Sequence, residues 1–239
     1  MGMPKKPEPT PPPAPATKGE RTRAAIVDAA LRLFQRHGYE GTTMREIARA
    51  AGVSLGNAYY YFESKEHLIQ AFYERTHREH LDACEPVLAR EKKLEDRLRG
   101  VLLAKIDTAE PYHRISGILF KTAADPKSPL NPFSPASEPV RREATDLMRR
   151  VIEGSSSKLP TDLREKLPEL LWLHEMSVIL FWIHDESKGR ARTRHLIERT
   201  VEMLAKLVSV AGLPLMKPLR TSVLSLVDEL KHDALPPGA

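Results

Sequence analysis

Cysteine is nearly absent from this chain of 239 residues, which has a single thiol at Cys84. One cysteine excludes an intramolecular disulfide and any zinc site built from several cysteines of one chain. We expect Cys84 to be a small buried helix residue rather than a redox sensor. A thiol with no partner in its own chain favours a reducing compartment, so the expected location is cytoplasmic.

Long hydrophobic runs are also missing. A membrane-spanning helix needs about 20 consecutive apolar residues, and the most apolar segment, residues 163–185, is interrupted by His174, Glu175 and Ser177. The N-terminal residues, rich in proline and lysine, lack the apolar core of a signal peptide. We therefore expect no membrane partner.

The sequence lacks the motifs of the common enzyme classes. It has no glycine-rich phosphate loop, nucleophile elbow or cysteine–histidine signature. His174-Glu175 is not followed by the second histidine of a metalloprotease helix. His67, His77 and His80 form no regular metal-ligand set. We expect no catalytic residues, no cofactor and no metal site.

Proline is abundant but confined to certain segments. Of 20 prolines, seven fall within residues 1–17 and five within residues 125–139. Because proline has no amide donor and disrupts helices, these segments are expected to be a disordered tail and an irregular loop that covers one end of a helical domain. Residues 233–239 form a second predicted disordered tail.

Apolar residues recur at helical spacing through the rest of the chain, and hydrophobic residues make up 41% of it, enough for a buried core. The pattern predicts an all-α fold, with a helix from Lys65 that ends at Pro86. The other expected helices span residues 20–37, 94–106, 112–123, 140–152, 163–185, 191–210 and 223–230.

Residues 42–62 carry the most specific signal, because they divide into two short helices, 43–51 and 55–62, joined by Gly52-Val53-Ser54. Thr43 and Glu46 have the spacing of a capping box. Gly52 suits the left-handed residue after a helix, and Ser54 suits the cap of the next one. This layout predicts a helix-turn-helix.

The second of these helices has one face suited to DNA. Helical spacing allows Leu55, Ala58, Tyr59 and Phe62 to pack inward and leaves Gly56, Asn57 and Tyr60 facing outward. Glycine permits close approach to bases, an asparagine amide matches an adenine edge, and a phenol can donate to phosphate. Residues 1–62 contain nine basic and five acidic residues, an excess that favours a polyanion. The alternative is a helical hairpin in which the tyrosines only pack.

At these positions the chain resembles the TetR family of bacterial transcriptional regulators. The resemblance covers about residues 20–71 and rests on T-T-M-R-E-I-A-R-A-A-G-V-S, L-G-N-A-Y-Y-Y-F and E-S-K-E-H-L. It implies phosphate contacts from Thr43, Tyr59, Tyr60 and Lys65, and groove-facing positions at Ser54, Gly56 and Asn57. Leu55 departs from the family pattern, because the family often has a basic or polar residue at this position. A leucine side chain can contact a thymine methyl instead.

The expected organisation is a helix-turn-helix domain at residues 18–64, a connecting helix at 65–86, and a helical effector-binding and dimerisation domain at 87–232. The segment 163–185 is apolar around almost its whole circumference, so it must be covered on both sides. With residues 191–210 it resembles the helix pair that forms the four-helix dimer interface of TetR-type proteins.

His174 and Glu175 are candidates for a ligand pocket, because polar groups inside an apolar helix require partners. The alternatives are a pairing of Glu175 with an arginine such as Arg114, or a place for both residues at the dimer rim. Large side chains that could surround an apolar or aromatic effector, or simply belong to the core, are Phe120, Trp172, Met176, Phe181 and Trp182.

The expected function is therefore a ligand-responsive repressor that binds double-stranded DNA as a homodimer at a pseudo-palindromic operator. Two alternatives stay open, a helical scaffold that binds proteins and a regulator without a small-molecule effector.

Overall fold

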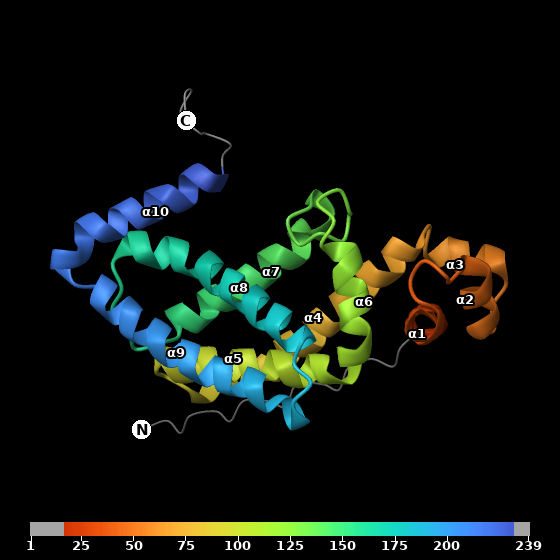
Figure 1. Ribbon diagram of the computed structural model, residues 1–239, viewed down its shortest axis with the longest axis horizontal. Coiled ribbons are helices and arrows are strands. Elements are labelled where there is room, and N and C mark those ends of the chain that lie inside the picture. The colour runs from red at the N-terminus through yellow and green to blue at the C-terminus, as the bar shows by residue number, and fades with distance from the viewer. Residues whose placement is uncertain (1–16, 232–239) are drawn as a thin grey trace, which may run out of the picture. The chain divides into compact units, whose positions relative to one another are not determined.

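The structure of the chain, a computed structural model, describes residues 17–231, with side chains described to residue 225. Nearly all of the first predicted tail, and all of the second, lie outside this range. Every regular element within it is a helix, which confirms the expected all-α fold (Figure 1). None of the described helices combines the length and apolar character needed to cross a bilayer.

Packing divides the chain into two compact units, with the division after Leu68. The first unit contains α1 (Lys18–His37), α2 (Met44–Ala50), α3 (Leu55–Tyr61) and the start of α4 (Lys65–Arg90). Its core is built from fully buried residues of all these helices and their junctions, namely Ile26, Ala30, Phe34, Ile47, Ala58, Phe62 and Leu68. Tyr39 is buried and packs on Phe34.

The predicted helix boundaries in this unit are confirmed by their hydrogen bonds. The Thr43 hydroxyl accepts from the Glu46 amide while the Glu46 carboxylate accepts from the Thr43 amide, which completes the capping box. Gly52 has φ of 71°, in the left-handed region that glycine tolerates without strain. Ser54 caps α3 by accepting from the Asn57 amide at 3.1 Å.

The helix α4 runs through Pro86 to Arg90, so the prediction that proline ends it there is wrong. Proline removes one amide donor but does not force a stop where packing holds the helix on both sides. Cys84 and Leu88, two positions before and after it, are buried in the core of the second unit. Burial also raises the pKa of the Cys84 thiol to about 12.

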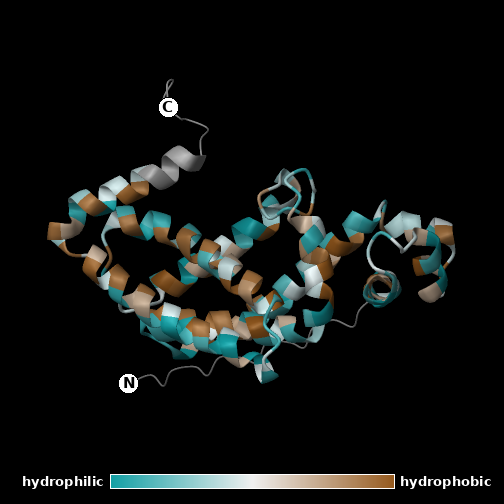
Figure 2. Ribbon diagram, in the orientation of Figure 1, coloured by the Kyte–Doolittle hydropathy of each residue, from teal (hydrophilic) through white to brown (hydrophobic). Residues whose placement is uncertain are grey.

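The second unit, from Ile69 onward, is a helical bundle that includes the rest of α4. Its other helices are α5 (Leu94–Ala109), α6 (His113–Ala123), α7 (Glu138–Glu153), α8 (Thr161–Ile183), α9 (Ala191–Ala211) and α10 (Lys217–Lys231). The helix α8 packs on α7 and α9, and α5 also packs on both of these helices. Apolar residues recur along α8 and α9 (Figure 2). The proline-rich loop ends in a short 3₁₀ helix, Pro135–Ser137.

One arginine ties three segments of this bundle together. Arg97 is 3% exposed and lies on α5. Its guanidinium donates to the carbonyls of Val151 (2.8 Å) and Arg150 (2.7 Å) on α7. It also donates to the carbonyls of Leu88 (2.6 Å) and Glu91 (2.8 Å) at the end of α4. A planar guanidinium therefore satisfies carbonyls from two helix ends.

Candidate nucleic-acid interface and effector cavity

The helix α3 presents an exposed polar and aromatic surface. Tyr60 is 81% exposed, and Ser54, Gly56 and Asn57 are also exposed. The expectation that Tyr59 packs inward is wrong, because its side chain is 47% exposed. Among residues 55–62, only Ala58 and Phe62 are buried. These two contacts hold the seven-residue helix in place while two adjacent tyrosines stay exposed.

The aromatic surface is held in place locally. The rings of Tyr60 and Tyr61 lie edge to face with their centroids 5.1 Å apart, a favourable geometry for aromatic pairs. The Ser54 hydroxyl oxygen accepts from the Asn57 amide, so its proton stays available to donate elsewhere. Leu55 is half-buried, so only part of its side chain is available for a methyl contact.

Thr43 and Lys65, the other two expected phosphate contacts, already have partners within the fold. The Thr43 hydroxyl donates to the Glu46 carboxylate at 2.9 Å, so contact with a phosphate requires that proton to be redirected. Lys65 donates to the Tyr39 carbonyl at 2.7 Å and lies 4.2 Å from the centre of that ring. An ammonium has three donors, so this bond leaves others for a phosphate.

Arg45 and Arg49 were not among the residues predicted to contact DNA. Both are exposed, one helical turn apart on α2, and α2 packs on α3. Their spacing of four residues was the signal that could have singled them out. They add positive charge to the helix-turn-helix, which suits a surface that meets phosphates.

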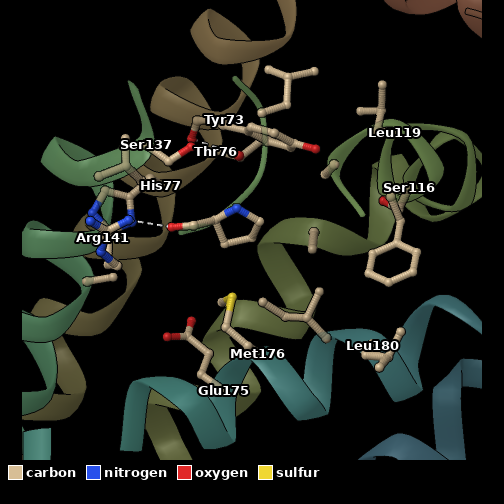
Figure 3. A pocket seen from close by; sticks show the side chains of 18 of the residues that line it. Tyr73, Thr76, His77, Ser116, Leu119, Ser137, Arg141, Glu175, Met176 and Leu180 are labelled. Carbon is tan, nitrogen blue, oxygen red and sulfur yellow. Dashed lines mark hydrogen bonds between the residues drawn. The ribbon is translucent and has the colours of Figure 1, made fainter. Parts of the chain in front are cut away.

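The second unit encloses a cavity of about 590 Å³ (Figure 3). Its walls come from α4, α5, α6, α7 and α8 and from the proline-rich loop. Phe133 of that loop is 64% exposed and Phe120 is 37% exposed, so the cavity wall reaches the surface. The loop thus contributes to the cavity as well as connecting two helices.

Five of the seven expected ligand-binding residues line this cavity: Phe120, Trp172, Glu175, Met176 and Trp182. His174 and Phe181 do not. Successive helix residues differ in direction by about 100°, and the side chains of these two residues face other partners. The Nε2 atom of His174 lies 3.2 Å from the Thr200 hydroxyl on α9, and the Phe181 ring lies 5.7 Å from the Arg192 guanidinium.

The suggested pairing of Glu175 with Arg114 is also wrong. Arg114 is exposed, whereas Glu175 is 1% exposed. The nearest charged group to the Glu175 carboxylate is Lys105 of α5, whose Nζ lies 3.7 Å from Oε1. His80 of α4 lies on the same side, with Nδ1 at 3.9 Å from that oxygen. Burial raises the pKa of Glu175 and lowers that of His80 to about 3.

Other polar wall residues had no signal in the sequence. His77 on α4 is 4% exposed, and burial lowers its pKa to about 4. Arg141 on α7 donates to the carbonyls of Pro132 (2.6 Å) and Ser134 (3.3 Å), which fastens the loop to the bundle. These residues come from separate helices, so only the fold brings them together.

The helix-turn-helix unit, followed by a helical unit with a cavity, places this chain among two-domain helical regulatory proteins. It belongs to the TetR family. Residues 26–72 match the family described as bacterial regulatory proteins, tetR family, and residues 97–230 match the tetracyclin repressor-like C-terminal domain. The family suggested by the sequence is therefore confirmed.

Individual relatives agree with this assignment. The chain is 38% identical over 81 residues to the probable HTH-type transcriptional regulator ArpR of Pseudomonas putida, over 34% of this chain and 36% of that protein. It is 33% identical over 161 residues to the regulator BetI of Rhizobium meliloti (strain 1021), over 62% of this chain and 70% of that one. The chain thus spans about a third of the length of ArpR.

The fold also matches solved structures. Fatty acid degradation regulator FadR from Bacillus halodurans superposes with a TM-score of 0.61, at 17% identity, over 77% of this chain and 94% of that one. At this identity the similarity concerns the fold. It includes the order of a helix-turn-helix unit and a following helical unit.

Proposed function

We propose that this chain is a ligand-responsive repressor that acts in the cytoplasm as a homodimer on a pseudo-palindromic operator. The observation that carries the proposal is the exposed surface of α3, where a glycine, an amide and two phenols face outward from a TetR-family helix-turn-helix. Two copies related by a twofold axis can place their α3 helices in successive major grooves, about 34 Å apart.

The roles of the α3 residues follow from their chemistry. Ser54, Leu55, Gly56 and Asn57 face the bases, and Thr43, Tyr59, Tyr60 and Lys65 contact phosphates. Base contacts determine sequence preference, whereas phosphate contacts contribute affinity that depends on salt. A selection of bound fragments from random duplexes tests the proposal directly. Failure to enrich any sequence, together with no binding at low salt, contradicts it.

We expect Asn57→Ala to relax base preference at one operator position, with a loss of about 1–3 kcal/mol of discrimination. The amide supplies a paired donor and acceptor that alanine lacks. The measurement is a comparison of motifs selected by the two proteins. Tyr60→Ala is the matched contrast, because loss of a phosphate donor should weaken all sequences alike and reduce the salt dependence. An unchanged motif for Asn57→Ala contradicts its proposed role.

The dimer is supported by apolar surface on two adjacent helices of the second unit. Leu173 (39%) and Leu180 (42%) are exposed on α8, and Met203 (54%), Leu207 (56%) and Val210 (47%) are exposed on α9. Their spacing places the two leucines on one face of α8 and the other three side chains on one face of α9, and exposed apolar patches mark interfaces. A homodimer would bury them in a four-helix contact between two α8–α9 pairs, which also completes the cover that α8 requires.

We expect Leu207→Glu to raise the dimer dissociation constant about tenfold or more, because it places an unpaired charge in a desolvated contact. Sedimentation over a concentration series measures the change. Gln35→Glu introduces the same side chain at an exposed position of α1 and should leave the association unchanged. An identical dissociation constant for Leu207→Glu and wild type contradicts this interface.

The cavity is the proposed effector site, and α4 is the proposed route of its effect. Phe72, Tyr73 and His77 of α4 line the cavity, and the same helix begins at Lys65 beside the helix-turn-helix. A ligand that favours one arrangement of α4 would change the separation of the two α3 helices and release DNA. Such a response requires different affinities of the ligand for the two arrangements.

A further inference from the structure

Glu175 is a buried carboxylate on the cavity wall with one oxygen that has no hydrogen-bond partner. The residue is 1% exposed and its Oε2 atom is unpaired. The nearest groups to Oε1, Lys105 Nζ at 3.7 Å and His80 Nδ1 at 3.9 Å, both lie beyond hydrogen-bond distance. A buried acceptor without a partner is costly, and more so when it is charged. Burial also raises the pKa of this carboxyl, so a cationic donor that reaches Oε2 would stabilise the charged form.

His80, which lies next to Glu175, adds a second acceptor. The Nε2 atom of His80 lies 3.0 Å from the Val101 carbonyl. A carbonyl only accepts, so Nε2 must carry the hydrogen. Burial keeps this histidine neutral, since its pKa is lowered to about 3. Its Nδ1 atom is then a lone-pair acceptor that faces the Glu175 carboxylate, and that atom is also unpaired.

The donors near Glu175 leave its Oε2 atom unpaired. Lys105 is the nearby cation, and its Nζ forms an ion pair with Oε1 at 3.7 Å. The Nη1 atom of Arg141 already donates to the Pro132 and Ser134 carbonyls. The Nε2 atom of His77 lies 3.3 Å from the exposed carboxylate of Glu143, without a hydrogen bond between them. Two acceptors, Oε2 of Glu175 and Nδ1 of His80, thus lie without a hydrogen-bond partner on this side of the cavity.

The rest of the wall is apolar and aromatic. Trp172, Trp182 and Phe120 line it, and Phe133 packs edge to face on Trp172 with ring centroids 5.6 Å apart. Figure 3 shows Glu175 and Arg141 toward one side of the cavity, and Leu119 and Leu180 toward the other. Aromatic faces attract cations, most strongly where water is excluded. A ligand that fits has an apolar body and a positively charged, hydrogen-bond-donating head.

We propose that the cavity selects organic ammonium ligands, with the ammonium donating to Oε2 of Glu175 and the apolar body against the aromatic wall. This inference rests on the proposed effector site and specifies its ligand class. An anionic head at the same place would meet the Glu175 carboxylate as a like charge. A neutral donor would satisfy Oε2 without compensating its charge.

Three probes of nearly equal size test the selectivity: phenylbutylamine, phenylbutanol and phenylbutanoate. The chain has two tryptophans, and both line the cavity, so intrinsic fluorescence reports binding without DNA. For the full-length protein we expect the amine to bind about tenfold or more tightly than the alcohol, a difference of about 1.4 kcal/mol. The carboxylate should bind most weakly of the three.

The variant Glu175→Gln should remove the preference for the amine while changing the affinity for the alcohol about threefold or less. Glutamine has the same shape, and a thermal melt checks that the variant is folded. Glu165→Gln is the matched control, because it makes the same substitution at an exposed position of α8 that does not line the cavity. It should keep the wild-type order of affinities.

Three results overturn the inference. They are tighter binding of phenylbutanoate, an amine preference that persists in folded Glu175→Gln, and no binding of any probe. If phenylbutanoate binds most tightly and loses that affinity in Lys105→Met, the cavity selects anions through Lys105. If the amine binds with the expected selectivity but does not change operator affinity, the inference is supported and the proposed effector response fails. The two proposals are therefore tested separately.

Discussion

Arg97→Met lowers the free energy of unfolding by about 3 kcal/mol or more, the largest effect on stability that we expect from a single substitution in this chain. The side chain is 3% exposed and its guanidinium donates to four backbone carbonyls. Methionine fills similar space but donates nothing. Each carbonyl left without a partner in a buried place costs about 1–3 kcal/mol, partly recovered where water can enter.

The local geometry shows how closely the guanidinium fits. A Cβ atom at Gly154 would clash with Nη2 of Arg97, so a larger residue there would displace the guanidinium at the end of α7. Chemical denaturation of wild type and variant measures the loss. Arg149→Met is the control, because that arginine is 48% exposed and pairs with Asp146 on the surface. An Arg97→Met loss no larger than the control's would contradict the structural role of Arg97.

Gly56→Leu should reduce operator affinity on the order of 100-fold while leaving the fold at least as stable as before. Nothing lies within 4 Å of a Cβ atom built at Gly56, and its φ is not in the left-handed region. The fold therefore does not require glycine there. Glycine in a helix costs about 0.5–1 kcal/mol relative to alanine, so its presence in α3 accords with the proposed close approach of DNA.

This prediction separates binding from folding. Thermal melting reports the stability of the variant, and titration with a selected operator reports its affinity. Gln35→Leu adds the same side chain to an exposed position of α1 and should leave affinity unchanged. Gly56→Ala should fall between wild type and leucine. If Gly56→Leu binds operator as tightly as wild type, α3 does not enter the groove at this residue.

The helix-turn-helix could be predicted almost to the residue because its signals are local. A capping box, a left-handed glycine and a serine cap each depend on residues within one turn, so Thr43, Gly52 and Ser54 are sufficient to place the boundaries. The prediction that Tyr59 packs inward failed because burial is not determined by neighbouring residues in the sequence. Helical spacing specifies a direction, but the extent of burial depends on what the rest of the fold places there.

The cavity could be predicted mainly from its α8 side, with Phe120 of α6 as the one predicted residue from another helix. Glu175 was recognisable because a carboxylate inside an apolar helix requires an explanation, and Trp172 and Trp182 share its helix. Its neighbours Lys105 and His80 come from α5 and α4, so the tertiary structure alone brings them together. Arg114 was the wrong partner because no pattern within α6 distinguishes an exposed arginine from one that faces another helix.

The burial of Cys84 has a practical consequence for measuring the movement of α3. This thiol is 0% exposed and its pKa is raised to about 12, so very little reactive thiolate is available at neutral pH. A cysteine introduced on the surface of the helix-turn-helix would then react selectively with a maleimide, without removal of the native thiol. Spin labels attached in this way in a dimer would give the distance between the two copies, with and without an amine probe.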